Sequence, residues 1–245
     1  MLGRHIVIEE KLDGSNVGIK IRQSKVVPQS RGHELTRGGS REQHFDLFKT
    51  WCAVHQEMLI DLLGERYILF GEWMLAKHTI YYDKLPHYFQ EFDVYDTHTE
   101  QFLSTKARRN MLSRLPICSV PVLYEGTAPK RLKDVLQWIQ SSLAKSAQWR
   151  QALDEEIKRT HVNPERTWQE TLQDEFSEGL YIKIEDDQHV LERLKWVRPD
   201  FLQSLQEQTT HWAERRVIHN QLVEGVDLFS PKKPGWFRPL PGGWS

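Results

Sequence analysis

The sequence has few cysteines, no long apolar run and no excess of charge of either sign. Its 245 residues include two cysteines, Cys52 and Cys118, which excludes a disulfide scaffold, and neither has a paired-cysteine metal spacing. No stretch approaches the roughly 18 consecutive apolar residues of a membrane span, and the first residues lack a signal-peptide apolar block. We therefore expect a cytoplasmic protein without a membrane partner.

The near absence of net charge limits how the chain could hold nucleic acid. Lysine and arginine total 33 against 34 acidic residues, a formal charge of −1. A domain that binds a polyanion by bulk attraction is usually strongly basic. Basic residues nevertheless concentrate in residues 1–41 and 100–133, and acidic residues in 154–178. We therefore expect any polyanion to be bound locally.

Hydrophobic periodicity predicts a mixture of strands and helices. Apolar residues that alternate around Asp13-Gly14 predict a hairpin of two strands. A three- and four-residue stripe from Phe45 to Leu62 predicts a helix that ends at Gly64. Further short strands are predicted at 67–73, 89–96, 179–185 and 193–197. The pattern without strict alternation favours an α+β fold.

The other predicted helices follow capping signals and apolar spacing. Ser104 is expected to cap a basic helix that reaches Arg114, and a second helix is expected over 132–143. Asn163-Pro164 is expected to begin a third, and the chain after Pro199 is expected to be helical to about Glu224. Residues 230–245 form a Pro/Gly/Trp tail.

The segment Glu10-Lys11-Leu12-Asp13-Gly14-Ser15-Asn16 is the most suggestive for chemistry. A lysine at a strand end, with an acid two residues later and a glycine turn beside it, can act as a nucleophile if its neighbours and burial lower its pKa. Taken alone, a strand lysine is more often solvated. The hypothesis therefore depends on the other motifs.

Those motifs occur in a fixed order downstream. They are Ser30-Arg31-Gly32, Phe70-Gly71-Glu72, Phe89-x-x-Phe92-Asp93-Val94-Tyr95, Glu178-Gly179-x-x-x-Lys183 and Arg193-x-Lys195-Trp196. With Lys-x-Asp-Gly-x-Asn, this order resembles the covalent nucleotidyltransferases, the superfamily of ATP-dependent ligases and messenger-RNA capping enzymes. Within it, the chain looks most like the RNA-ligase-2-like branch of the ATP-dependent RNA ligases.

The resemblance implies a fold and an activity. The fold would be an α+β nucleotidyltransferase domain, ATP-grasp-like, with antiparallel sheets flanked by helices over residues 1–198. A helical appendage and tail over 199–245 would pack on the same domain. A closed oligonucleotide-binding barrel is not expected there, because it would need a run of short strands that the sequence pattern does not show. The activity would join 5′-phosphate and 3′-hydroxyl RNA ends through a lysyl-AMP intermediate and an AMP-capped 5′ end.

The resemblance also implies roles for particular residues. Lys11 would be the nucleophile, kept partly unprotonated by nearby Lys183, Lys195 and Mg²⁺. The other expected contributions are a pocket organised by Asp13 and Asn16, nucleotide contacts from Glu10 and Arg31, a ribose contact from Glu72, adenine stacking on Phe92, metal binding through Glu178 and an α-phosphate contact from Lys183. The expected cofactors are ATP and Mg²⁺, with Mn²⁺ as a substitute.

One motif departs from the family pattern. The last motif is usually Lys-x-Lys, and here it is either Arg193-Leu194-Lys195 or Lys195-Trp196-Val197. The first is preferred, because arginine keeps the positive charge that a leaving pyrophosphate needs.

Other functions remain open at this stage. A GTP-dependent capping-type guanylyltransferase or a minimal DNA ligase would share the lysine chemistry. A non-catalytic RNA-binding module with a relic pocket would use the basic helix 104–114 and the tail. The expected partners are RNA ends or nicks, with DNA or hybrid strands as alternatives and an end-healing kinase or phosphatase as a candidate, and the chain is expected to be a monomer.

Overall fold

The computed structural model describes residues 3–36, 42–113, 115–207 and 217–229. Its strands are β1 (His5–Lys11), β2 (Ser15–Arg22), β3 (Lys25–Ser30), β4 (His33–Glu34), β5 (Tyr67–Trp73), β6 (Phe89–Asp96), β7 (Gln101–Leu103), β8 (Cys118–Ser119), β9 (Val122–Thr127), β10 (Gly179–Glu185) and β11 (His189–Val197). The helices are the 3₁₀ turn η1 (Gln43–Phe45), α1 (Asp46–Val54), α2 (Gln56–Leu63), α3 (Thr105–Leu112), α4 (Leu132–Leu136), α5 (Trp149–Thr160), α6 (Pro164–Gln169) and α7 (Pro199–Glu207). The α+β class is confirmed.

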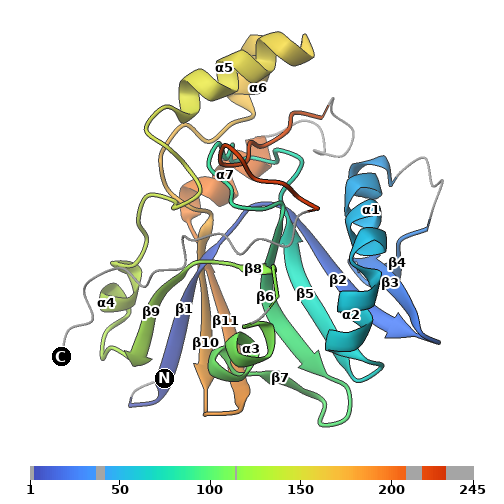
Figure 1. The fold of residues 1–245 in the computed structure, drawn as a ribbon. Coiled ribbons are helices and arrows are strands. Elements are labelled where there is room, and N and C mark those ends of the chain that lie inside the picture. The colour runs from blue at the N-terminus through green and yellow to red at the C-terminus, as the bar shows by residue number, and fades with distance from the viewer. Residues whose placement is uncertain (1–2, 37–41, 114, 208–216, 230–245) are drawn as a thin grey trace.

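The strands form one large sheet that is antiparallel except where β8 pairs with β6. Its order is β4-β3-β2-β5-β6-β7-β11-β10-β1-β9. Figure 1 shows β1 and β2 diverging from their shared turn into two halves of the sheet. The predicted hairpin is therefore wrong, although both strands exist. β1 pairs with β9 and β10, whereas β2 pairs with β3 and β5.

The turn at Asp13-Gly14 separates these halves because other segments occupy its surroundings. A Cβ on Gly14 would lie 2.6 Å from Met74 Sδ and 2.9 Å from the Trp73 carbonyl oxygen. The glycine thus allows close approach of the chain that follows β5, and that approach prevents β2 from folding back on β1.

Two of the helices cover one half of the sheet. The stripe from Phe45 to Leu62 gives η1, α1 and α2 instead of one helix, and the break falls at His55, whose Nδ1 lies 2.9 Å from the Trp51 carbonyl oxygen. Gly64 ends α2 with φ 50°, as the sequence predicts. Phe48, Trp51 and Leu59 then pack in the core against residues of β2 and β5.

Two predicted caps are confirmed. Ser104 accepts a hydrogen bond from the Ala107 amide at the start of α3, and Asn163 accepts one from the Arg166 amide at the start of α6. The predicted end of the first helix at Arg114 lies outside the described residues.

Two helix predictions are wrong in their extent. α4 ends at Leu136, and the expected continuation to residue 143 instead bridges other segments, with Ser141 paired to Phe176 and the Ser142 hydroxyl bonded to Glu10. The helix expected to continue to about Glu224 is described as α7 up to Glu207, residues 208–216 lie outside the described residues, and residues 217–223 are not helical because their backbone bonds to the chain between β5 and β6. The tail 230–245 lies outside the described residues.

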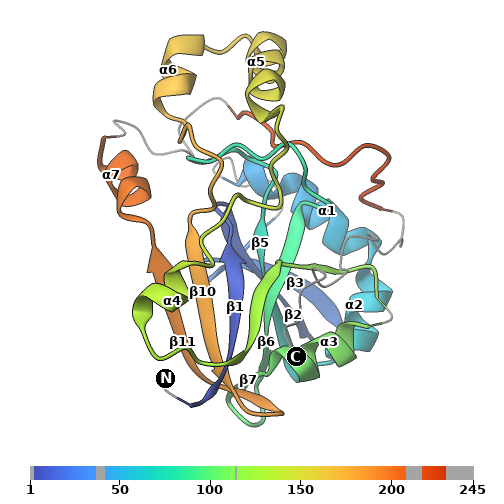
Figure 2. The same ribbon diagram turned by 90° about the vertical axis from the view of Figure 1, so that its left-hand side faces the viewer.

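The helices α5 and α6 project from the end of the sheet where β1 meets β2, as Figures 1 and 2 show. The sequence reading did not predict α5. Within the part of the chain that the structure describes, no helix has the length and apolarity needed to cross a membrane.

Candidate active site

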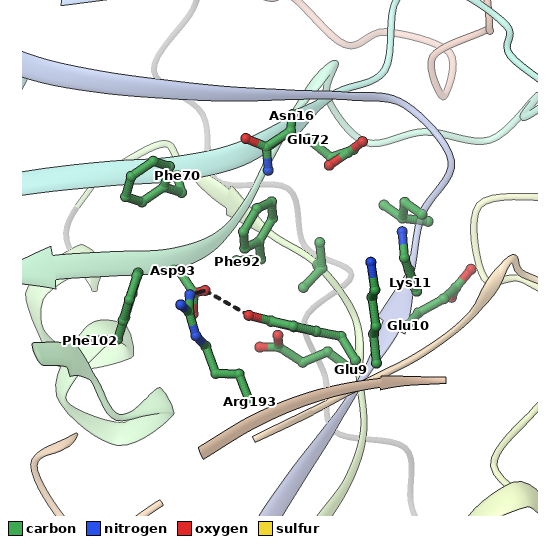
Figure 3. A pocket seen from close by; sticks show the side chains of 14 residues that line it. Glu9, Glu10, Lys11, Asn16, Phe70, Glu72, Phe92, Asp93, Phe102 and Arg193 are labelled. Atoms are coloured by element: carbon green, nitrogen blue, oxygen red, sulfur yellow. Dashed lines mark hydrogen bonds and ion pairs between the residues drawn. The ribbon is translucent and has the colours of Figure 1, made fainter. Parts of the chain in front are cut away.

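A cavity of about 350 Å³ opens between the two halves of the sheet. Figure 3 shows Lys11 at one end, the rings of Phe70 and Phe102 at the other, and Glu72 and Phe92 between them. The lining residues are Glu9, Glu10, Lys11, Leu12, Asn16, Phe70, Glu72, Phe92, Asp93, Phe102, Val120, Tyr181, Arg193 and Lys195. Residues from β1, β2, β5, β6, β7, β10 and β11 therefore meet in one space.

Lys11 is the last residue of β1, and its ammonium group pairs with Glu178. Both carboxylate oxygens of Glu178 lie 2.8 Å from Lys11 Nζ. The register explains the pairing, because Lys11 lies opposite Gly179, the first residue of β10. A Cβ on Gly179 would lie 2.0 Å from the Trp196 carbonyl oxygen, so this glycine lets β11 approach. The side chain of Lys11 remains 26% exposed.

The expectation that cationic neighbours leave Lys11 partly unprotonated is wrong for this arrangement. Burial acts to lower the pKa of Lys11, but the charge and hydrogen bond of Glu178, with the charges of Glu72 and Asp13, raise it above its ordinary value. Lys183 lies opposite Val7, four residues along β1 from Lys11, or about 13 Å at strand spacing.

Lys183 is enclosed instead of exposed to the cavity. Its ammonium group is fully buried and lies 2.9 Å from both Glu9 Oε2 and Asp93 Oδ1. It also donates a hydrogen bond to the Phe92 carbonyl oxygen. These partners separate it from the cavity, so the expected direct contact with an α-phosphate does not fit this geometry.

Three carboxyl groups near Lys11 hold their protons more tightly than usual. Burial raises the pKa of Glu72 to about 8 and that of Glu10 to about 7. Burial also raises the pKa of Glu178 to about 7 against the opposing charge of Lys11. Glu72 accepts a hydrogen bond from the Gly14 amide at 3.2 Å. Clusters of acids with displaced pKa values are typical of catalytic sites.

Asp13 lies beside the cavity instead of on its wall. Its carboxylate accepts hydrogen bonds from the amides of Thr79 and Ile80 at 2.7 and 2.8 Å, and its Oδ1 lies 3.7 Å from His78 Nδ1. Burial opposes its ionisation, but His78 and these two amides outweigh burial and lower the pKa of Asp13. Asp13 thus connects the turn after Lys11 to the segment that follows β5.

The far end of the cavity is aromatic. Phe92, on β6, packs edge-on against Tyr181 with ring centroids 6.0 Å apart. The guanidinium carbon of Arg193 lies 3.6 Å from the centroid of the Phe102 ring, and Arg193 Nη1 lies 3.1 Å from Asp93 Oδ2. This end suits a planar ring that stacks on an aromatic side chain.

Strand register decides how the last motif is read. Arg193 and Lys195 both line the cavity, and Leu194 between them is exposed elsewhere, which favours Arg193-Leu194-Lys195. Lys11 lies opposite Gly179 of β10. Lys195 lies opposite Tyr181, two residues along β10 from Gly179, and Arg193 lies opposite Lys183, four residues along. Lys195 is therefore the cation of this motif nearer Lys11, and Arg193 belongs to the aromatic end.

Asn16 and Arg31 lie at the same end of β2. Asn16 lines the cavity opposite Glu72 in the strand register. Arg31 is exposed in the turn after β3, with φ 43°, and is joined to Asn16 through the Ser30 hydroxyl, which donates to the Asn16 carbonyl oxygen at 2.9 Å. Arg31 is near the cavity but not among its lining residues.

In the described part of the basic helix, residues 104–113, the cations Lys106, Arg108 and Arg109 are paired with carboxylates. Arg108 is 1% exposed and lies between Glu9 and Glu91, with Nη1 3.0 Å from Glu91 Oε1. Lys106 and Arg109 pair with Asp187 and Glu125, each at 3.0 Å. Arg108 is therefore unavailable to RNA, whereas Arg114 and the tail, which the alternative of an RNA-binding module also used, lie outside the described residues.

Seven lining residues had no function expected from the sequence, namely Glu9, Leu12, Phe70, Asp93, Phe102, Val120 and Tyr181. Phe70 was detectable, because period 2 in β5 puts it on the face of Glu72. Phe102 gave no such signal, since β7 has three residues.

The donor set at the cavity fits a hard divalent cation only in part. Among the described residues, no group of three or more His, Cys, Asp or Glu side chains could hold a metal ion. Glu178 and Glu72 offer carboxylate oxygens, the donors that Mg²⁺ prefers, and a bound nucleotide and water would supply the other ligands.

Comparisons with known proteins give a consistent result. The sequence model of the family described as RNA ligase matches residues 4–197. No curated protein matches the chain.

Solved structures share the fold. The Naegleria gruberi RNA ligase with PPi is 19% identical, with a TM-score of 0.57 over 84% of this chain and 53% of that chain. Two variants of that ligase with ATP and Mn are 17% and 19% identical, with TM-scores of 0.54 and 0.57 and the same coverage. This chain thus spans about half the length of those ligases.

Proposed function

Because this chain belongs to the RNA ligase family, we propose that it is an ATP-dependent RNA ligase that works through Lys11. In the first step the lysine amine attacks the α-phosphorus of ATP, a P–N bond forms, and the bond to the bridging oxygen breaks to release pyrophosphate. AMP then passes to a 5′-phosphate end, and a 3′-hydroxyl displaces it to form the phosphodiester.

The observation that carries this proposal is the Lys11–Glu178 ion pair at one end of a cavity with an aromatic opposite end. The amine must lose a proton before it can attack. Glu178 lies 2.8 Å from Nζ, and its pKa, raised by burial to about 7, suits a group that accepts a proton near neutral pH. The raised pKa of Lys11 means that this transfer precedes attack.

The strand register gives a direction for the nucleotide. With the α-phosphate at Lys11, the ribose would lie by Glu72 and Asn16 and the base against Phe92. Lys195 would then offset charge on the phosphates, since it lies nearer to Lys11 than Arg193 does. The sequence alone suggested that Arg193 contacts the leaving pyrophosphate. In this proposal Arg193 instead contacts the base end of the nucleotide.

A divalent cation would complete the site. Glu178 would hold it through a bound water, which leaves a carboxylate oxygen for the Lys11 proton, and Mg²⁺ or Mn²⁺ would supply positive charge to the phosphate oxygens. The Naegleria gruberi ligases with ATP and Mn support this choice of nucleotide and ion.

The test is covalent labelling. The protein is incubated with Mg²⁺ and either α-labelled ATP or α-labelled GTP, denatured, and examined for label beside Lys11→Ala and an EDTA control. We expect label from ATP only, dependent on Mg²⁺ and absent in Lys11→Ala. Label from GTP only would exclude the ATP ligase, and no label from either nucleotide would exclude every lysine-based enzyme considered.

A chase tests the joining step and the substrate. The labelled protein is mixed with nicked duplexes whose strands are RNA, DNA or hybrids, and with single-stranded RNA carrying a 5′-phosphate. We expect AMP transfer and sealing where the reacting ends are RNA. Sealing confined to DNA nicks would favour the minimal DNA ligase.

A further inference from the structure

A segment far along the chain from the nucleophile fastens the loop that holds it. Residues 217–223, part of the red segment in Figure 1, run beside the chain between β5 and β6. The Lys77 amide donates to the Ile218 carbonyl oxygen at 2.8 Å, and the Gln221 amide donates to the Tyr82 carbonyl oxygen at 2.8 Å. The isolated bridges Ala76–His219 and Leu85–Leu222 continue the contact.

Asn220 is the centre of this contact. Its side chain is 1% exposed, and its Nδ2 donates to the Met74 carbonyl oxygen at 2.7 Å. Its Oδ1 accepts from the Tyr82 amide at 2.9 Å. One amide group therefore ties together two parts of the 74–82 loop that are eight residues apart.

The same loop holds the turn that follows Lys11. The Asp13 amide donates to the Tyr82 hydroxyl oxygen at 2.9 Å. The Asp13 carboxylate accepts from the amides of Thr79 and Ile80, at 2.7 and 2.8 Å. The backbone amide and the side-chain carboxylate of Asp13 are thus both held by the 74–82 loop, whose shape depends on Asn220. Lys11 precedes Asp13 by two residues, so the loop also restrains the end of β1.

We infer that Asn220 is a positioning residue for Lys11, acting through the 74–82 loop and Asp13. The inference rests on the proposed function for its kinetic consequence. Nucleophilic attack requires the amine and the phosphorus to be held in line, and a displacement of about 1 Å can slow such a step on the order of 100-fold. Loss of Asn220 frees the loop without removing any group that touches the nucleotide.

The experiment measures the rate of lysyl-AMP formation against ATP concentration in Asn220→Ala and Tyr82→Phe. Tyr82→Phe removes only the hydroxyl oxygen that accepts from Asp13, so it tests the same connection if Asn220→Ala fails to fold. We expect kcat to fall on the order of tenfold or more in each, with KM for ATP changed less than about threefold. Val223→Ala, at an exposed position of the same segment, is the matched control and should keep the wild-type rate.

A second measurement separates positioning from plain stability and needs no nucleotide. Hydrogen–deuterium exchange, followed by mass spectrometry, gives the protection of the Asp13, Thr79 and Ile80 backbone amides in each folded protein. Since these amides form the connection between Asp13 and the 74–82 loop, at 2.7 to 2.9 Å, both variants should exchange them faster than wild type. A lowered melting temperature with unchanged exchange of these amides and unchanged kcat would overturn the inference.

The two proposals fail in different ways. If the wild-type protein forms no lysyl-AMP, the proposed function fails, and the amide exchange of the Asp13 turn alone then decides whether Asn220 fixes the turn beside Lys11. If the wild type is labelled but both variants match it in kcat and in amide exchange, only the positioning inference fails.

Discussion

The ammonium group of Lys11 lies 2.8 Å from the carboxylate of Glu178, although 167 positions separate the two residues in the chain. The pairing of β1 with β10 produces this contact, because Glu178 directly precedes the residue opposite Lys11. The pair stores the proton that must leave before the lysine can react, so the pH dependence of the reaction should report it.

Lysyl-AMP formation should speed up as pH rises through about 7. Burial raises the pKa of Glu178 to about 7, and only its carboxylate form can accept the Lys11 proton. Glu178→Gln should remove this limb of the profile and slow the step by roughly 10²- to 10⁴-fold. Single-turnover labelling between pH 5.5 and 9 checks this. A wild-type rate that is flat across pH 7 would contradict the assignment.

Glu72 should make the protein less stable at alkaline pH. Its pKa is raised by burial from 4.5 to about 8, so the folded state binds more protons than the unfolded state between these values. The stabilising contribution is complete below pH 4.5 and is lost as pH rises through about 8. Glu72→Gln should therefore match wild type near pH 4.5 and exceed its free energy of unfolding at pH 8.5 by on the order of 2 kcal/mol. Urea denaturation at both pH values measures the difference. The prediction would be refuted if the free energy of unfolding changed equally with pH in wild type and Glu72→Gln.

Arg108 should be needed for folding stability and not for RNA affinity. Its guanidinium neutralises Glu9 and Glu91, and all three side chains are buried. Arg108→Met should lower the free energy of unfolding by about 3–5 kcal/mol, because it leaves the buried Glu91 carboxylate without its ion-pair partner and leaves Glu9 with Lys183 alone. Arg109→Ala removes an exposed pair with Glu125 and should cost less than about 1 kcal/mol. Similar losses in the two variants, measured by urea denaturation, would argue against this account.

Phe92 should contribute to ATP affinity more than to the chemical step. It lies in the cavity between Lys11 and the rings of Phe70 and Phe102, and loss of a stacked base is worth about 1–3 kcal/mol. Phe92→Leu should raise KM for ATP by about tenfold with a smaller change in kcat. Phe229→Leu, an exposed aromatic position outside the cavity, provides the control. An unchanged KM for ATP in Phe92→Leu would contradict the placement of the base against Phe92.

Local pattern predicted many of the elements, because short-range physics determines them. β5, β6 and β10 have the predicted bounds, and the caps at Ser104 and Asn163 form as expected. Failures occurred where a distant segment competes for the same hydrogen bonds. Residues 217–223, predicted to be helical, are not helical because Asn220 and its neighbours bond to residues 75–85.

The candidate site divides in the same way. The ordered motifs identified Lys11, Glu72, Phe92 and Glu178 by residue type and spacing, and these residues contact or line one cavity. The sequence could not show that Lys183 is buried between Glu9 and Asp93. Alternation in β10 predicts on which face of the sheet the side chain lies, but not which residues cover that face.

By itself, the sequence determined which residue types are available and that they occur in a family order from Lys11 to Lys195. The tertiary structure decided their protonation and partners, which depend on the burial and charge that β-sheet pairing brings together. The pKa of Lys11 illustrates the difference. The family resemblance implied cationic neighbours that would lower it, whereas the pairing of β1 with β10 gives it Glu178 and raises it.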